Sequence, residues 1–217
     1  NKYAYTFASW LVRAQYSYKG RYMVSASIRG DGSSRFAPNT RWGYFPAASV
    51  GWRMSDENFL RNVKWLDDLK LRASVGQTGN AQIGNSEYLA LYGMTNTDLG
   101  NGLTSQVYPS QIANNDLGWE KNTQYNIGLD VSLWRGTLGF TADYYYSKTT
   151  DMLFELATPI ESGYTTIFTN IGDMVNRGLE IELNADLIRT KNLVWDFSLN
   201  MTHYKNKVTH LPEQFKN

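Results

Sequence analysis

The sequence predicts an all-β protein, built as a transmembrane antiparallel up-and-down β-barrel. Three observations predict this: apolar and polar residues alternate over long runs, the connections are alternately tight and long, and aromatic residues, 14% of the chain, gather near the ends of the runs. A soluble β-sandwich shows the same alternation. The runs continue for about 10 to 14 residues, whereas globular strands usually end near five or six and about 9 to 11 tilted residues cover a bilayer core. Run length therefore favours the barrel.

Composition removes several classes of protein. The 217 residues carry a formal net charge of +1 with 19% charged residues, so the chain lacks the basic field of a nucleic-acid-binding protein. No cysteine is present, which removes disulfides and thiolate metal sites. No apolar run reaches the length of about 18 residues that a membrane-spanning helix needs. The chain begins at Asn1 without a targeting signal, so we expect a mature chain or, preferably, a piece of a longer one.

Four strands are predicted in the first part of the chain. The alternating runs are residues 10–18, 22–29, 44–53 and 69–76. Because only Lys19 and Gly20 separate the first two apolar series, they indicate a hairpin. Pro46 has no N–H to donate to a ladder, so we expect a ragged start or a bulge there.

Four more strands follow, which brings the total to about eight. Their runs are residues 123–134, 137–146, 179–187 and 195–202. Short turns, Arg135–Gly136 and 189–192, join them into two further hairpins.

The connections predict which end of the barrel is which. The long ones, residues 31–40, 77–120 and 149–175, all fall at one end. Bacterial outer-membrane barrels place long loops outside the cell and tight turns in the periplasm. We expect 77–120 to be an ordered, partly folded extracellular loop. Between strands, 56–62 is expected to form one helical turn capped by Ser55 or Asp56.

Alternation also assigns the two faces of the wall. Lipid-facing positions are predicted to include Leu129, Val131, Phe140, Leu183 and Phe197. Asp130, Glu180 and Glu182 are expected to face the lumen. On this assignment Leu129→Arg should be costly, whereas Asp130→Asn should be nearly silent for folding.

Six lumen-side carboxylates raise the question of catalysis. They are Asp130, Asp143, Glu180, Glu182, Asp186 and Asp196. A glycosidase places two carboxylates across a sugar, but six on a wet wall indicate lumen lining. We expect ion pairs between them and the cations Arg13, Arg21, Arg29, Arg53, Lys70 and Arg72. The chain is therefore not expected to be an enzyme.

Two short motifs compete with this interpretation and are not favoured. Arg29, Gly30 and Asp31 form an Arg-Gly-Asp sequence, and Gly30 with Gly32 resembles a phosphate loop. A phosphate loop needs a Lys-Ser/Thr pair opening a helix, and Phe36 with an alternating run follows instead.

The long loop holds the candidate substrate-binding residues. Aromatic rings stack on sugars and amide or carboxylate groups bind hydroxyls, and the residues of these types are Tyr88, Tyr92, Tyr108, Asn115, Asp116 and Trp119. Plain loop packing is the alternative for each. No cofactor and no metal site are expected.

Several stretches together resemble the barrel of SusC-like (RagA-type) TonB-dependent outer-membrane transporters of Bacteroidota. They are "RGDGSSRFAPNTRWGYFPAASVGWRM" at 29–54, "LKLRASVGQTGN" at 69–80, "NDLGWE" at 115–120, "QYNIGLDVSLWRGTLGFTADYYYSKTTDML" at 124–153 and "NIGDMVNRGLEIEL" at 170–183. The resemblance implies that residues 1–217 are an internal segment of a barrel of roughly 22 strands. Plug domain, TonB box and signal peptide are expected outside this chain.

The same resemblance implies an importer of glycans or peptides, energised by TonB and capped by a SusD-like surface lipoprotein. Lipid bilayer and substrate are the other expected partners, and nucleic acid is not. The alternative is a structural or adhesive outer-membrane barrel that docks partner proteins through its long loops.

Overall fold

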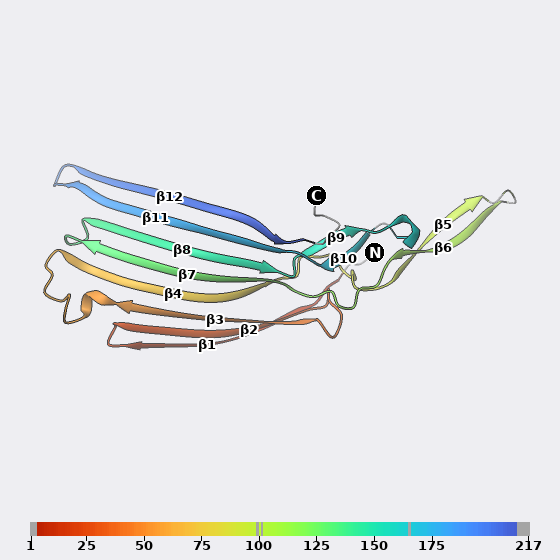
Figure 1. The fold of residues 1–217 in the computed structure, drawn as a ribbon, viewed down its shortest axis with the longest axis horizontal. Helices are drawn as coiled ribbons and strands as arrows, with labels where there is room; N and C mark the ends of the chain where they lie inside the picture. Colours follow the sequence, from red (N-terminus) through yellow and green to blue (C-terminus); the bar gives the residue numbers. More distant parts are fainter. Residues whose placement is uncertain (1–3, 99, 101, 165, 212–217) are drawn as a thin grey trace.

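The computed structural model describes residues 4–98, 100, 102–164 and 166–211, and one eight-stranded antiparallel sheet dominates it (Figure 1). Its strand order is β1-β2-β3-β4-β7-β8-β11-β12. The strands are β1 (Phe7–Tyr18), β2 (Tyr22–Ser33), β3 (Trp42–Arg53), β4 (Leu66–Asn80), β7 (Glu120–Leu133), β8 (Leu138–Thr150), β11 (Asp173–Arg189) and β12 (Val194–His210). Each strand pairs with the next in this order, so the predicted up-and-down arrangement of eight strands is confirmed.

Tight turns join the strands at one end of the sheet. Between β7 and β8, Trp134, Arg135 and Gly136 all have positive φ angles, of 52°, 59° and 80°. Such left-handed turns match the twist of the strands that they connect. No helix in the described part of the chain has the length and apolar character needed to cross a membrane.

The opposite end carries the long connections, and two small hairpins fold within them. One pairs β5 (Leu91–Asp98) with β6 (Leu103–Gln111), and the other pairs β9 (Leu153–Ala157) with β10 (Thr166–Asn170), with a short 3₁₀ helix, η2 (Ile160–Ser162), between its strands. The β5–β6 hairpin projects beyond the main sheet (Figure 1). The expectation of a partly folded segment within 77–120 is thus confirmed.

A hydrogen-bonded turn forms within the expected range 56–62, but the Ser55 cap is not made. A 3₁₀ helix, η1 (Met54–Asp56), directly follows β3, and the next turn is closed by a 2.9 Å bond from the Arg61 N–H to the Glu57 carbonyl. The Ser55 hydroxyl instead donates to the Asp68 carboxylate at 3.0 Å. Capping by Ser55 was therefore wrong, because a carboxylate on β4 binds its hydroxyl.

Pro46 produces a ragged edge but no bulge. Its pairing with Ile28 on β2 continues the regular β2–β3 register. On the other side, the β3–β4 ladder stops one residue away, at Ala47 opposite Gly76. The two strands therefore separate above Pro46, where its missing N–H costs the ladder no bond.

Phe45 fills the space where β3 and β4 separate. A Cβ atom on Gly79 would overlap the Phe45 ring, so this glycine admits the ring. The ring belongs to a buried cluster at the loop end of the sheet, formed by Phe36, Phe45, Ile83, Leu117 and Trp119. The cluster fixes the long loop to the barrel wall, because Ile83, Leu117 and Trp119 come from that loop.

The register confirms that the predicted apolar residues share one face. Leu183 lies opposite Phe140, which lies opposite Val131. Their neighbours along the strands, such as Asp130, point to the other face, because side chains alternate.

Candidate functional site

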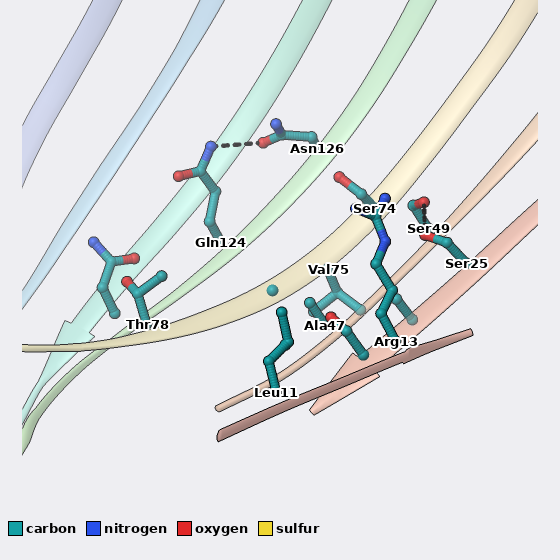
Figure 2. A pocket seen from close by; sticks show the side chains of 14 residues that line it. Leu11, Arg13, Ser25, Ala47, Ser49, Ser74, Val75, Thr78, Gln124 and Asn126 are labelled. Atoms are coloured by element: carbon teal, nitrogen blue, oxygen red, sulfur yellow. Dashed lines mark hydrogen bonds between the residues drawn. The ribbon is translucent and has the colours of Figure 1, made fainter. Parts of the chain in front are cut away.

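Two hollows lie on the polar face of the sheet. The first, of about 460 Å³, lies over β1 to β4 and β7 (Figure 2). Ser25 and Ser49 share a 2.8 Å hydrogen bond at one side, and the Gln124 amide donates to Asn126 at 2.9 Å at the other (Figure 2). The lining offers hydroxyl and amide groups, which bind water or a polar solute.

A second hollow, of about 550 Å³, adjoins the first towards the tight turns. Both are lined by Arg13, Ser25, Ser49 and Ser74. The register places Ser25 opposite Ser49 and Ser49 opposite Ser74, so three short side chains lie in one row across neighbouring strands. We call the two hollows together the polar trough. It exists because short residues occupy the positions where larger ones would fill the wall.

Arg72 marks one edge of the polar trough. Its guanidinium donates to both carboxylate oxygens of Asp130, at 2.7 and 2.8 Å, and also to Asp143 at 3.0 Å. Three adjacent strands, β4, β7 and β8, are thereby joined by one cation. Forked, charge-assisted hydrogen bonds of this kind are roughly twice as strong as neutral ones.

Charge is divided unequally across the polar face. Three pairs are local to one part of the sheet: Arg29–Asp31, Arg53–Asp68 and Arg189–Asp186. Of the other charged groups, the basic ones come from β1 to β4, namely Arg13, Lys70 and Arg72, and the acidic ones come from β7 to β12, namely Asp130, Asp143, Glu180, Glu182 and Asp196. The ion pairs expected between the two sets form only at Arg72. In the described residues Arg13, Lys70, Glu180 and Glu182 make no ion pair, which corrects the general pairing expected from the sequence. Lys70 lies directly opposite Asp130, but both oxygens of that carboxylate already accept from Arg72. Arg13 on β1 is separated from Glu180 and Glu182 on β11 by the intervening strands.

The remaining expected cations are held locally. Arg29 binds Asp31 at 2.8 Å, and Arg53 lies 3.3 Å from Asp68. Asp31 is only 5% exposed, so the Arg-Gly-Asp sequence is not presented to a partner.

Glu57 is a residue that sequence reasoning missed. Its carboxylate accepts hydrogen bonds from the Tyr22 hydroxyl, from the Trp52 indole at 3.1 Å and from Arg21 at 3.4 Å. The bond from Tyr22, followed by that from Trp52, lowers the pKa of Glu57. Its partners are 5 to 36 positions away, so no local motif signals the cluster.

The predicted substrate-binding residues do not form one group. Tyr92 lies on β5, where 70% of it is exposed, and Tyr108 lies on β6 against Gly93. Tyr88 is half-buried near the base of the hairpin, and its carbonyl accepts from the Asn114 N–H at 3.1 Å. The two hairpin rings are therefore accessible at the loop end.

The other three candidates follow in the chain. Asn115 and Asp116 are exposed, with the Asp116 N–H bound to the Asn114 side chain at 3.2 Å. Trp119 is 6% exposed, packs against Phe36 and Phe45, and donates to the Arg41 carbonyl at 3.1 Å. Its burial supports the packing alternative rather than stacking on a sugar.

Long antiparallel strands with one apolar and one polar face, and tight turns gathered at one end, define the wall of a bacterial outer-membrane barrel. The chain matches the family described as "TonB dependent receptor-like, beta-barrel" over residues 1–214. It belongs to that family, and it is part of an outer-membrane protein.

Curated relatives come from Bacteroidota. A TonB-dependent receptor of Formosa agariphila is 40% identical over 210 residues, which are 97% of this chain and 20% of that protein. The TonB-dependent receptor SusC of Bacteroides thetaiotaomicron is 39% identical over 212 residues, covering 95% of this chain and 21% of SusC. The chain thus spans about a fifth of the length of these relatives.

A solved structure shares the fold closely. The structure of the RagAB peptide transporter superposes with a TM-score of 0.86 at 30% identity, over 95% of this chain and 23% of that chain. The SusC-like resemblance seen in the sequence is confirmed.

Proposed function

We propose that the complete protein imports a nutrient, a glycan or a peptide, across the outer membrane. The observation that carries the proposal is the polar trough, which lies on the inner face of a wall whose outer face is apolar. Transport needs such a polar, water-filled path and no covalent chemistry. Two of the carboxylates on this face, Asp130 and Asp143, are already bound by Arg72. The similarity to the RagAB peptide transporter supports a peptide as substrate. The resemblance of the sequence to SusC-like transporters supports a glycan as the other candidate.

In this proposal residues 1–217 form an internal part of a barrel of roughly 22 strands. TonB energises the protein through parts outside this chain, and a SusD-like lipoprotein covers its outer end. At the mouth, Tyr88, Tyr92, Tyr108, Asn115 and Asp116 contact substrate or lid. Support for this comes from the exposure of the hairpin rings.

Uptake by cells tests the proposal. A strain that lacks the gene, complemented with wild-type protein, should recover uptake of labelled oligosaccharide or peptide only when TonB is functional. Arg13→Glu with Lys70→Glu reverses charge in the polar trough and should lower uptake. The matched control, Lys19→Glu with Arg135→Glu, reverses the same charge in the tight turns. Equal uptake with and without the gene would instead favour a docking barrel.

A further inference from the structure

Five basic side chains lie on the outward, apolar face near the loop end of the sheet. We call them the basic belt: Lys121 on β7, Lys148 on β8, Arg177 on β11, and Lys205 and Lys207 on β12. The register sets Lys148 opposite Val175 and Arg177 opposite Tyr146. Their positions continue the alternation of the apolar residues below them, so they point away from the polar trough.

Three cations of the basic belt pair with no carboxylate in the part of the chain that the structure describes. Lys121 lies 3.7 Å from Asp151, and Lys148 lies 3.2 Å from Asp173. Arg177, Lys205 and Lys207 are exposed and form no ion pair in the described residues. Carboxylates therefore neutralise only the β7–β8 part of the belt.

The arrangement of Arg177 and Lys205 is unfavourable on its own. They are direct cross-strand neighbours on the same face of β11 and β12. Like charges directly opposite each other destabilise a sheet. An anion between the two strands, about 4.8 Å apart, would remove this repulsion and accept hydrogen bonds from both groups.

The height of the basic belt identifies the source of that anion. Tyr125 and Tyr146 continue the cross-strand row of Arg177 and Lys205, and their ring centroids lie 6.4 Å apart. Tyrosines on the outward face of a barrel mark the level of the lipid headgroups. Because the long loops place this end outside the cell, the headgroups here belong to the outer leaflet.

We propose that the basic belt binds the phosphate groups of an outer-leaflet glycolipid, with Arg177 and Lys205 as its centre. The site is separate from the polar trough and does not depend on what the protein transports.

The test uses the full-length protein in phosphatidylethanolamine vesicles with or without phosphorylated lipopolysaccharide. Native mass spectrometry after detergent extraction measures the glycolipid retained. Arg177→Gln with Lys205→Gln should lower retention about tenfold or more, because the loss of each cation near a charged surface weakens binding about fivefold. Lys19→Gln with Arg135→Gln, which removes the same charge at the opposite end, should retain as much as wild type. Dephosphorylated lipopolysaccharide should be retained weakly by every variant.

A second readout is the sign of the stability change. Without the glycolipid, Lys205→Gln should raise the unfolding midpoint, because it removes repulsion from Arg177. With the glycolipid, the same variant should lower it. Three results would each overturn the proposal. The double variant could retain as much glycolipid as wild type, or Lys205→Gln could shift the unfolding midpoint in the same direction in both membranes. The third result is full displacement of the glycolipid by equimolar inorganic phosphate.

Discussion

Arg72 lies directly across the β4–β7 ladder from Gly128, and its guanidinium passes over that glycine to reach Asp143 on the next strand. A Cβ atom at Gly128 would lie 2.8 Å from the Arg72 Cζ and would overlap the Asp143 carboxylate. The bridge therefore requires a glycine here, because the guanidinium occupies the space that a side chain would fill.

Gly128→Ala should accordingly destabilise the barrel by about 1 to 3 kcal/mol, because the guanidinium or the strand must shift. Gly139→Ala is the matched control, since its nearest atom, the Asn184 Cβ, lies 3.9 Å away. Urea titration of the full-length protein in vesicles measures both. A Gly128→Ala barrel as stable as the Gly139→Ala barrel would show that the bridge adapts freely.

Substitutions at Leu129 and at its neighbour Asp130 test which face of the wall meets the lipid and which meets the lumen. Arginine at position 129 should cost about 2 to 4 kcal/mol near the bilayer middle. The expectation that Asp130→Asn is silent needs correction, because Asp130 accepts two hydrogen bonds from Arg72. Both groups are about a third exposed, so we expect a loss of about 0.5 to 1 kcal/mol.

Glu180→Gln supplies the silent substitution in the same unfolding titration, since Glu180 forms no ion pair in the described residues. A cost for Glu180→Gln equal to that of Leu129→Arg would contradict the assignment of faces.

Acid should remove the contribution of Glu57. Hydrogen bonds from Tyr22 and Trp52 hold the pKa of Glu57 below its ordinary value of 4.5, so its carboxylate stabilises the fold above that pH. As pH falls through the lowered pKa, this stabilisation is lost. Glu57→Gln should therefore be less stable than wild type at neutral pH, and the difference should vanish in acid.

Thermal unfolding across pH, with Asp56→Asn as the exposed control, measures the Glu57 effect. A difference between Glu57→Gln and wild type that persists unchanged at low pH would count against it.

Deleting residues 96–106 should leave the barrel intact, because it removes the tip of the β5–β6 hairpin and no strand of the main sheet. Under the proposed function, retention of a SusD-like lipoprotein during affinity purification, or substrate uptake, should fall. Trp119→Ala should instead destabilise the folded loop. Removing this buried ring should lower the free energy of unfolding by about 3 to 5 kcal/mol, which should appear as faster hydrogen exchange in the long loop. Normal uptake and lid retention in the deletion strain would make the hairpin dispensable.

The strands were predictable because period two survives wherever one face is apolar, as from Tyr125 to Leu133. The prediction stopped short where that signal ends. β11 begins at Asp173, six residues before the predicted start, because Asp173 and Arg177 occupy positions of the apolar face and interrupt its alternation. Alternation says nothing about pairing between distant strands, so the contacts of Arg72 and Glu57 needed the register. The role of Trp119 was ambiguous for the same reason: the rings that bury it come from residues 36 and 45.

The separation of β3 from β4 above Pro46 has a mechanical consequence. Elsewhere in the sheet, spreading two neighbouring strands would break ladder hydrogen bonds one after another. Between Trp42–Pro46 and the end of β4 there is no ladder to break, and the contacts that hold the segments together are those of the Phe45 ring and the hydrogen bonds of Thr40 with Leu117 and of Trp119 with Arg41. The rim of the wall is therefore softest at this seam, and strain applied to the mouth should open it there first.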